Sequence, residues 1–337
     1  MKNIITNMRI NKHFLKKTNA ENIVKNLCGI QTQIFRYGLF SILLRSGVFS
    51  DYKNFFVNWT LRGTLHTHTI DDLPVFLHEN SESSYSKAIL EDNSEISYER
   101  KNYFRDIIKN CIISGLSTRA EIISECFKYG LKDYEKNIIF NSWGGLLRNM
   151  AEKGEIIYSF SRQKKFLICP DFDPMPEENA KKIMLERYFK NYAPATIRDA
   201  SYFFGWPQKI IRAFIKNEKP EYISYLGDKY YFLSRENYEK KSDYLILSGF
   251  DPFLIGYNKK YSIILEKSFI RKVYTLQGMI YPTILFENDI VGTWRIDGKN
   301  INIEIFRNKK NFDESYVKKL ISQITDFEIN NFEFLYI

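Results

Sequence analysis

The chain is poor in cysteine, and its cysteines form no recognisable metal or redox motif. Cys28, Cys111, Cys126 and Cys169 are widely spaced and include no Cys-x-x-Cys pair, which argues against a zinc site and against a redox-active pair. His66 and His68 alternate, but no third ligand follows at a spacing suited to a metal ion. We therefore expect reduced, buried cysteines, no metal and no other cofactor.

Long apolar runs are also absent. No stretch of about 18 apolar residues occurs, so the sequence predicts no transmembrane helix. The first seven residues, Met-Lys-Asn-Ile-Ile-Thr-Asn, do not form the apolar core of a secretory signal. We expect a cytoplasmic, monomeric protein that does not associate with membranes.

Apolar and aromatic residues, by contrast, are plentiful. The chain has 337 residues, is 44% hydrophobic and contains 27 Phe and 23 Tyr. This composition can form packed cores and excludes wholesale disorder. A chain of this length usually folds around more than one hydrophobic core, which indicates two or more domains.

The charge balance favours a polyanionic partner. The formal net charge is +9 and the sequence pI is about 9.1. Because the chain is also rich in Lys, Asn, Ile and Tyr, as AT-rich coding produces, the net charge alone is weak support for nucleic-acid binding. The distribution says more, since residues 1–20 contain basic residues and no acid, whereas acids cluster over residues 91–99. Segregated charge suggests one face adapted to phosphates.

The middle of the sequence repeats one unit. In the first copy, Thr118 and Glu121 predict a capping box for a helix over 120–127. A second helix is expected at about 135–153, followed by a hairpin over 155–168 that turns near residues 161–164.

In the second copy, Thr196 and Asp199 occupy the matching capping positions, and Gly-Trp-Pro at 205–207 predicts a turn. A helix over 208–217 and strands over 222–226 and 230–233 should follow. Helix, turn, helix and two-stranded wing is the winged-helix plan, with the second helix available to DNA. Such units also serve as protein-interaction modules, so a scaffold remains an alternative.

The two ends of the chain differ from this repeat. The N-terminal third predicts helices over 8–17, 20–28 and 34–46 and an extended segment over 59–69, and residues 82–115 predict a helical connector. The last ninety residues predict strands over 261–265, 279–286, 290–296 and 301–306, which suggests a small β-barrel or sheet.

Five strings follow one another in a recognisable order. They are Gln31-Thr32-Gln33; Trp-Thr-Leu-Arg-Gly-Thr-Leu-His at 59–66; Tyr-Ala-Pro-Ala-Thr-Ile-Arg-Asp at 192–199; Ser-Gly-Phe-Asp-Pro-Phe-Leu-Ile-Gly-Tyr at 248–257; and Ile-Val-Gly-Thr-Trp-Arg at 290–295. Together they resemble the AlkZ/YcaQ family of winged-helix DNA glycosylases. Two departures stand out: Ala193 replaces the usual Gly, and Thr32 replaces the usual apolar residue between the glutamines.

The resemblance implies an α+β fold with three tandem winged-helix units in a C-shaped arrangement, closed by a C-terminal β-barrel-like domain. The implied domains are a first winged-helix unit, a helical connector, a second and a third winged-helix unit and the β-barrel domain, at 1–81, 82–116, 117–176, 177–244 and 245–337.

The resemblance also implies the site. Gln31 and Gln33 would be the catalytic pair, acting on double-stranded DNA. Nucleic-acid contacts are expected from Trp59, Arg62, His66, Lys164 and Lys165. A hydrogen-bonded structural histidine is the alternative for His66, and a solvated charge pair is the alternative for the two lysines. Asp251, beside Pro252, is expected to hold a turn rather than to act as an acid.

A glutamine pair restricts the chemistry. Glutamine offers a carbonyl acceptor and two N–H donors but cannot act as a general base near neutral pH. A purine alkylated at N7 or N3 is cationic and already a good leaving group, so a carbonyl that holds the attacking water can suffice. The two side chains share a direction only in an extended segment, because residues two apart on a helix point about 200° away from each other.

The sequence therefore predicts a monofunctional DNA glycosylase for cationic N7-alkylguanine and N3-alkyladenine, with bulky adducts and interstrand crosslinks as further substrates. No lysine is marked as a Schiff-base nucleophile, so no lyase step is expected. The alternative is a non-catalytic winged-helix DNA-binding protein, such as a transcriptional regulator.

Overall fold

The computed structural model describes residues 1–15, 18–47, 52–91, 95–234, 243–307, 310–325 and 327–337. The chain is a mixed α+β protein and forms two compact units. Residues 1–50 and 184–337 make the first unit, and residues 51–183 make the second. The expected helix over 8–17 ends at residues 16 and 17, which lie outside the described residues.

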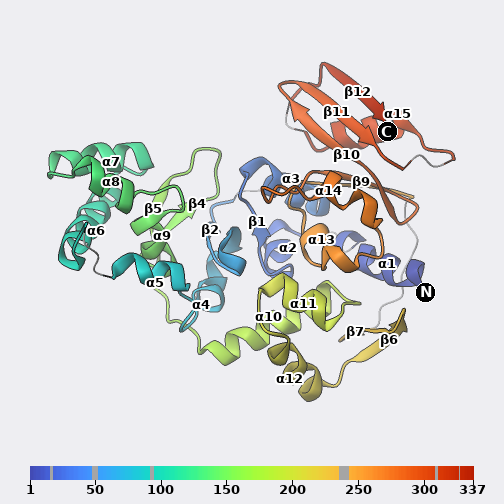
Figure 1. Cartoon of the computed structure of the whole chain (residues 1–337), viewed down its shortest axis with the longest axis horizontal. Coiled ribbons are helices and arrows are strands. Elements are labelled where there is room, and N and C mark those ends of the chain that lie inside the picture. The colour runs from blue at the N-terminus through green and yellow to red at the C-terminus, as the bar shows by residue number, and fades with distance from the viewer. Residues whose placement is uncertain (16–17, 48–51, 92–94, 235–242, 308–309, 326) are drawn as a thin grey trace. The chain divides into compact units, whose positions relative to one another are not determined.

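Helices make up much of both units (Figure 1). Those of the first unit are α1 (Lys2–Ile10), α2 (Ala20–Asn26), α3 (Phe35–Ser46), α11 (Ile197–Phe204), α12 (Gln208–Glu218), α13 (Pro252–Ile255), α14 (Ile270–Val273) and α15 (Glu314–Ser322). Those of the second are α4 (Leu73–Phe76), α5 (Ser84–Leu90), α6 (Tyr98–Ile113), α7 (Arg119–Lys128), α8 (Asp133–Ile139) and α9 (Gly145–Glu152), and α10 (Glu177–Asn191) runs from the second unit into the first.

The predicted capping boxes are confirmed. At the start of α7, the Thr118 side chain accepts from the Glu121 N–H. The Glu121 side chain in turn accepts from the Thr118 N–H. Thr196 and Asp199 make the same exchange at the start of α11. These side chains satisfy backbone N–H groups that have no partner within the helix.

The single helix expected over 135–153 is wrong, because two helices, α8 and α9, occupy this span. Gly144 precedes α9 and Gly145 begins it, with φ of 109° and 56°. Positive φ is costly for other residues and interrupts a right-handed helix. α9 is buried along its whole length.

In the described part of the second unit, four strands lie in the order β3-β2-β4-β5. Their bounds are β2 (Phe55–Trp59), β3 (Leu65–Thr69), β4 (Ile156–Ser159) and β5 (Phe166–Ile168). β2 and β3 form a hairpin in which Asn58 faces His66, and β4 pairs with β2 on its other side. Phe56, Leu73, Leu77, Ile157 and Cys169 form the apolar cluster of this sheet.

The second repeat has the expected elements. α11 ends at Gly205 in the left-handed conformation, and α12 begins after Pro207. The hairpin of β6 (Glu221–Tyr225) and β7 (Asp228–Phe232) follows, with positive φ at both Leu226 and Gly227. Two such residues make the tight turn whose twist suits a β-hairpin.

The C-terminal strands form an open sheet, so the expected β-barrel-like domain is corrected. The strand order is β12-β11-β10-β9-β8, from β8 (Tyr244–Leu247), β9 (Thr283–Phe286), β10 (Asp289–Asp297), β11 (Asn300–Ile305) and β12 (Asn331–Tyr336). Among the described residues, no pairing joins β8 to β12. β12 follows α15 and adds to β11 in parallel, so it extends one edge of the sheet instead of closing it (Figure 1).

One predicted strand is wrong. The span 261–265 contains the end of a short 3-10 helix (Lys259–Tyr261) and a bend, and its Ile264 and Leu265 are buried. A short apolar run can pack into a core without strand pairing, which alternation alone does not reveal.

Within the described ranges, no helix is long and apolar enough to span a bilayer.

Candidate functional site

The two glutamines lie in the connection between α2 and α3, not within a helix. α2 ends at Asn26, and Cys28 and Gly29 follow with φ of 55° and 87°. The Gly29 N–H donates to the Val24 carbonyl at 2.8 Å, which satisfies one of the last carbonyls of the helix. Gln31 ends the two-residue strand β1 (Ile30–Gln31), and Gln33 precedes α3. The backbone is therefore extended at Gln31, whereas Gln33 lies in a bend before α3.

The glutamines differ in exposure. Gln31 is 6% exposed, whereas Gln33 is exposed at the surface. A buried amide keeps a fixed orientation and a less screened dipole than a solvated one. Gln31 is therefore the more firmly held of the two side chains.

The turn before Gln31 is held by the end of α10. The Tyr192 hydroxyl donates to the Leu27 carbonyl at 2.8 Å, and the Asn191 amide donates to the Asn26 carbonyl at 2.9 Å. Tyr192 is itself fully buried, and its carbonyl accepts from the Tyr257 hydroxyl at 2.8 Å. Two of the five strings that carry the family resemblance, at 192–199 and 248–257, thus support the glutamine segment through hydrogen bonds.

Gly38, which sequence reasoning missed, positions the residue between the glutamines. Gly38 lies in the first turns of α3, and a Cβ atom built on it would lie 2.0 Å from Thr32 Cγ2. The Thr32 methyl group therefore occupies the space that any larger residue at position 38 would need. A signal was present in the sequence, since glycine inside a helix costs about 1 kcal/mol relative to alanine and commonly has a packing reason.

α3 also packs against the last two of these five strings, at 248–257 and 290–295. Trp294, which is fully buried, stacks on Phe40 with ring centroids 6.3 Å apart. The Ser248 hydroxyl donates to the Tyr37 carbonyl at 2.8 Å. These contacts hold α3, which starts two residues after Gln33.

Asp251 holds a turn, as predicted. Its Oδ1 accepts from the Phe253 N–H at 2.8 Å and caps α13. The same oxygen accepts from Arg45 Nη2 at 2.7 Å, and its Oδ2 accepts from Arg45 Nη1 at 3.1 Å. Both side chains are buried, so this bidentate pair fixes the end of α3.

In the second unit, the hairpin of β2 and β3 carries three of the expected DNA contacts. Trp59, at the end of β2, packs on Tyr158 with ring centroids 5.3 Å apart. Arg62 lies in the connecting turn with φ of 56° and is partly exposed. His66 lies in β3 and is 1% exposed. The turn therefore offers Trp59 and Arg62 to solvent, whereas His66 is enclosed.

His66 is a neutral, hydrogen-bonded histidine. Its Nδ1 donates to the Thr64 carbonyl at 3.0 Å, so Nε2 carries the lone pair. Burial, assisted by the charge of Arg62, lowers the pKa of His66 to about 3. Among the residues that the structure describes, His66 Nε2 has no hydrogen-bond partner.

Lys164 and Lys165 lie in the connection between β4 and β5, and both are exposed. They belong to the same sheet as the β2–β3 hairpin, through the pairing of β4 with β2. The structure thus brings Gln31 and Gln33 together in one segment of the first unit, and the five expected DNA contacts onto two hairpins of the second.

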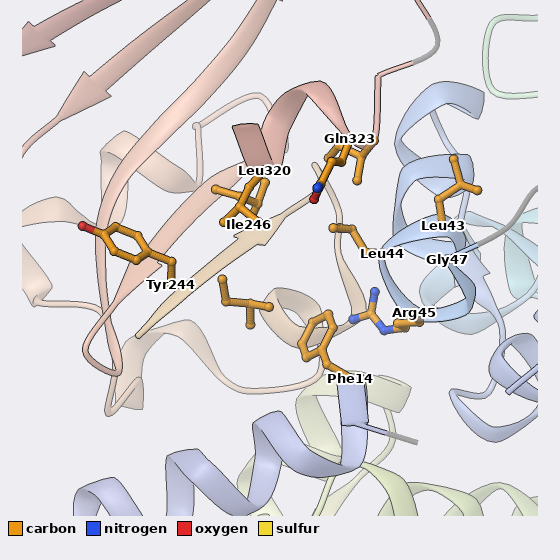
Figure 2. A pocket seen from close by; sticks show the side chains of 11 residues that line it. Phe14, Leu43, Leu44, Arg45, Gly47, Tyr244, Ile246, Leu320 and Gln323 are labelled. Carbon is orange, nitrogen blue, oxygen red and sulfur yellow. The ribbon is translucent and has the colours of Figure 1, made fainter. Parts of the chain in front are cut away.

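The first unit contains a cavity of about 510 Å³ that is separate from the glutamine segment (Figure 2). It is lined mainly by apolar side chains at the end of α3, along β8 and on α15, with Arg45 beside Phe14. The described residues that line it include neither Gln31 nor Gln33. In the part of the chain that the structure describes, no group of three or more His, Cys, Asp or Glu could hold a metal ion.

Comparison with known proteins agrees with the sequence landmarks. The sequence model of the family described as "DNA glycosylase AlkZ-like" matches residues 143–306. A curated relative, the "Interstrand DNA cross-link repair glycosylase" of Streptomyces sahachiroi, is 20% identical over 350 aligned residues, which cover 92% of either chain. The solved structure of Streptomyces sahachiroi DNA glycosylase AlkZ has the same fold, with a TM-score of 0.76 at 18% identity over 99% of both chains. These findings confirm the resemblance of this chain to the AlkZ-like DNA glycosylases.

Proposed function

We propose that this protein is a monofunctional DNA glycosylase that hydrolyses the N-glycosidic bond of cationic N-alkylated purines in duplex DNA. The observation that carries the proposal is the Gln31-Thr32-Gln33 segment, which lies outside the helices between α2 and α3 and is held there by buried hydrogen bonds. The similarity to AlkZ-like glycosylases supports the same reaction class.

The glutamine amides set the substrate class. Residues 28–38 contain no Asp or Glu, so the segment itself supplies no general base. In the proposed reaction the bond between C1′ and the purine nitrogen breaks, and the bond electrons neutralise the cationic base. Water adds its oxygen to C1′ and releases a proton to solvent. An unmodified purine would leave as an anion, and a neutral amide does not stabilise that departure.

Each glutamine has its own role. The Gln31 carbonyl accepts from the attacking water and fixes its position, which reduces the entropic part of the barrier. Its dipole also opposes the positive charge that develops on the sugar. Gln33, at the surface, supports the same water or the sugar. Trp59, Arg62, Lys164 and Lys165 are proposed to contact the DNA, whereas His66, which is 1% exposed, is proposed to be the hydrogen-bonded structural histidine.

The finer architecture is part of the proposal. Residues 1–81, 117–176 and 177–244 would be three winged-helix units, with 82–116 as a connector and 245–337 as the last domain. The order α11, α12, β6, β7 supports this assignment for the third unit.

Bulky adducts and interstrand crosslinks are proposed as further substrates. The curated relative's name, "Interstrand DNA cross-link repair glycosylase", supports this extension. An exposed Gln33 is compatible with a lesion too large for a closed pocket.

The test is release of 7-methylguanine from alkylated duplex DNA under single-turnover conditions. Wild type should release the base and leave an abasic strand that is cut only after alkaline treatment. Gln31→Ala should lower the rate about 100-fold or more, as does removal of one preorganised group at other hydrolytic sites, and Gln33→Ala should lower it less.

Gln277→Ala is the matched control, because Gln277 is an exposed glutamine of the same unit. Equal release by wild type and the Gln31→Ala, Gln33→Ala double variant would remove the site assignment. Duplex binding without release of 7-methylguanine or of a crosslink would favour the regulator.

A further inference from the structure

α12 has one apolar face and packs through it into the first unit. Ile211 and Phe214 are buried, and the Phe214 ring stacks on Phe189 with centroids 5.8 Å apart and planes 13° apart. The opposite side of the helix is exposed, and it carries charge of one sign.

Three basic side chains, Lys209, Arg212 and Lys216, form this exposed side, here called the α12 basic stripe. At 100° per residue they lie within about 60° of one another around the helix axis. Glu218 is the acid of α12, and it lies about 120–180° away from the three stripe residues around the helix axis. No carboxylate of the helix therefore neutralises the stripe.

The charges of α12 are mostly unfavourable for the stability of the helix. Lys209 lies in the first turn, where no acid is present, and Glu218 lies in the last. Both positions are unfavourable for the helix dipole, whereas Lys216 in the last turn is favourable. Lys209 with Arg212 and Arg212 with Lys216 are like-charged pairs at spacings three and four, which cost a few tenths of a kcal/mol each. α10 shows the stabilising alternative, since its Lys181 pairs with Glu177 one turn earlier.

We propose that the α12 basic stripe binds the phosphate backbone of duplex DNA and holds the substrate. This inference rests on the proposed action on DNA, but it concerns affinity rather than bond cleavage. α12 is the second helix of a helix-turn-helix followed by a hairpin, the position that faces DNA in such folds. From Lys209 to Lys216 the stripe extends about 10 Å, enough to face about three phosphates of one strand when it runs parallel to the DNA axis, along which they rise 3.4 Å each.

The test is the salt dependence of binding to an undamaged duplex of about 20 base pairs, followed by fluorescence anisotropy with the full chain. Each lost phosphate contact lowers the slope of log K against log salt by about 0.9. The variant K209Q/R212Q/K216Q should therefore lose about 2.7 from the slope. Between 50 and 200 mM NaCl, wild-type affinity should fall about 40-fold more than that of the variant. The loss should be similar on duplexes of different sequence, because phosphates carry no sequence information.

The matched control is K267Q/K299Q/K319Q, which removes the same charge from exposed lysines of the same unit. Its slope should match wild type. Equal slopes for all three proteins, or equal losses in both variants, would contradict DNA binding by the α12 basic stripe. The glycosylase proposal would be unaffected by either result. A lower slope for the stripe variant alone, in a protein that releases no alkylated base, would support the stripe and contradict the glycosylase. A wild-type chain that does not bind duplex DNA would overturn both.

Discussion

Gly38 and Thr32 are in contact so close that position 38 has no room for a side chain: a Cβ atom there would lie 2.0 Å from Thr32 Cγ2 and 3.1 Å from Thr32 Cβ. The residue between the two glutamines thus rests directly on the backbone of α3. The contact also accounts for threonine at a position where an apolar residue was expected, because its methyl group makes the packing contact.

Gly38→Ala should lower 7-methylguanine release about tenfold or more. The added methyl group pushes Thr32 away from α3 and moves both flanking glutamines, and displacements of about 1 Å at a reacting group can cost 100-fold in rate. Single-turnover release from alkylated duplex DNA measures the effect. Thr32→Ala removes the clashing Cγ2 atom, so G38A/T32A should release the base faster than G38A alone. No recovery in the double variant would show that Gly38 acts through something other than Thr32.

The sequence predicted local elements well where side chains specify the backbone directly. Thr118 with Glu121, and Thr196 with Asp199, placed two helix starts correctly because a capping box satisfies its own backbone groups. The strand over 261–265 failed because Ile264 and Leu265 are buried by tertiary packing. The open sheet was missed because β12 pairs in parallel with β11, a contact between segments that no local pattern encodes.

The candidate site shows the same division. The extended form of the Gln31 segment followed from Cys28 and Gly29 ending the preceding helix, a local feature. The support of that segment by Tyr192 could not be predicted from a local feature, because Tyr192 contacts Leu27 across 165 positions of sequence. The landmark Trp294 is a packing residue, which explains how a string can mark a family without taking part in its chemistry.

Asp251→Asn should destabilise the first unit by about 3–5 kcal/mol. The change keeps the shape of the side chain but leaves the buried Arg45 guanidinium without its counter-charge, and removing one partner of a buried pair costs this much. Urea unfolding followed by circular dichroism gives the value. Glu304→Gln is the control, because the Lys272–Glu304 pair is partly exposed and should contribute no more than about 1 kcal/mol. Similar losses in both variants would contradict the account of the buried pair.

Gly145→Ala should destabilise the second unit more than Gly130→Ala does. Both glycines have positive φ, 56° and 82°, so each substitution brings backbone strain of about 1 kcal/mol or more. A Cβ atom at Gly145 would in addition lie 2.2 Å from the Ile139 carbonyl oxygen, whereas nothing lies within 4 Å at Gly130. Thermal unfolding of the two variants should show the larger loss for Gly145→Ala. Equal shifts would mean that α8 and α9 can separate at no cost.

His66 should make the protein less stable in mild acid. Its pKa is about 3 when folded, against an ordinary value of 6.5, because burial and the charge of Arg62 disfavour the protonated ring. The unfolded chain therefore binds the proton more tightly, and stability falls as the pH drops from about 6.5 towards 3. Between pH 7.5 and 5.0 this one group should remove about 2 kcal/mol.

The measurement is urea unfolding of wild type and His66→Asn at both pH values. Asparagine can keep the donor to the Thr64 carbonyl but does not titrate. Buried His13, whose pKa is also well below its ordinary value because of burial and the neighbouring Arg45, contributes equally to both proteins and cancels in the comparison. His66→Asn should start from a lower stability at pH 7.5, because the smaller side chain packs less well, and then lose about 2 kcal/mol less on acidification. Parallel losses in the two proteins would mean that the His66 ring takes up a proton in the folded state, as an exposed histidine does.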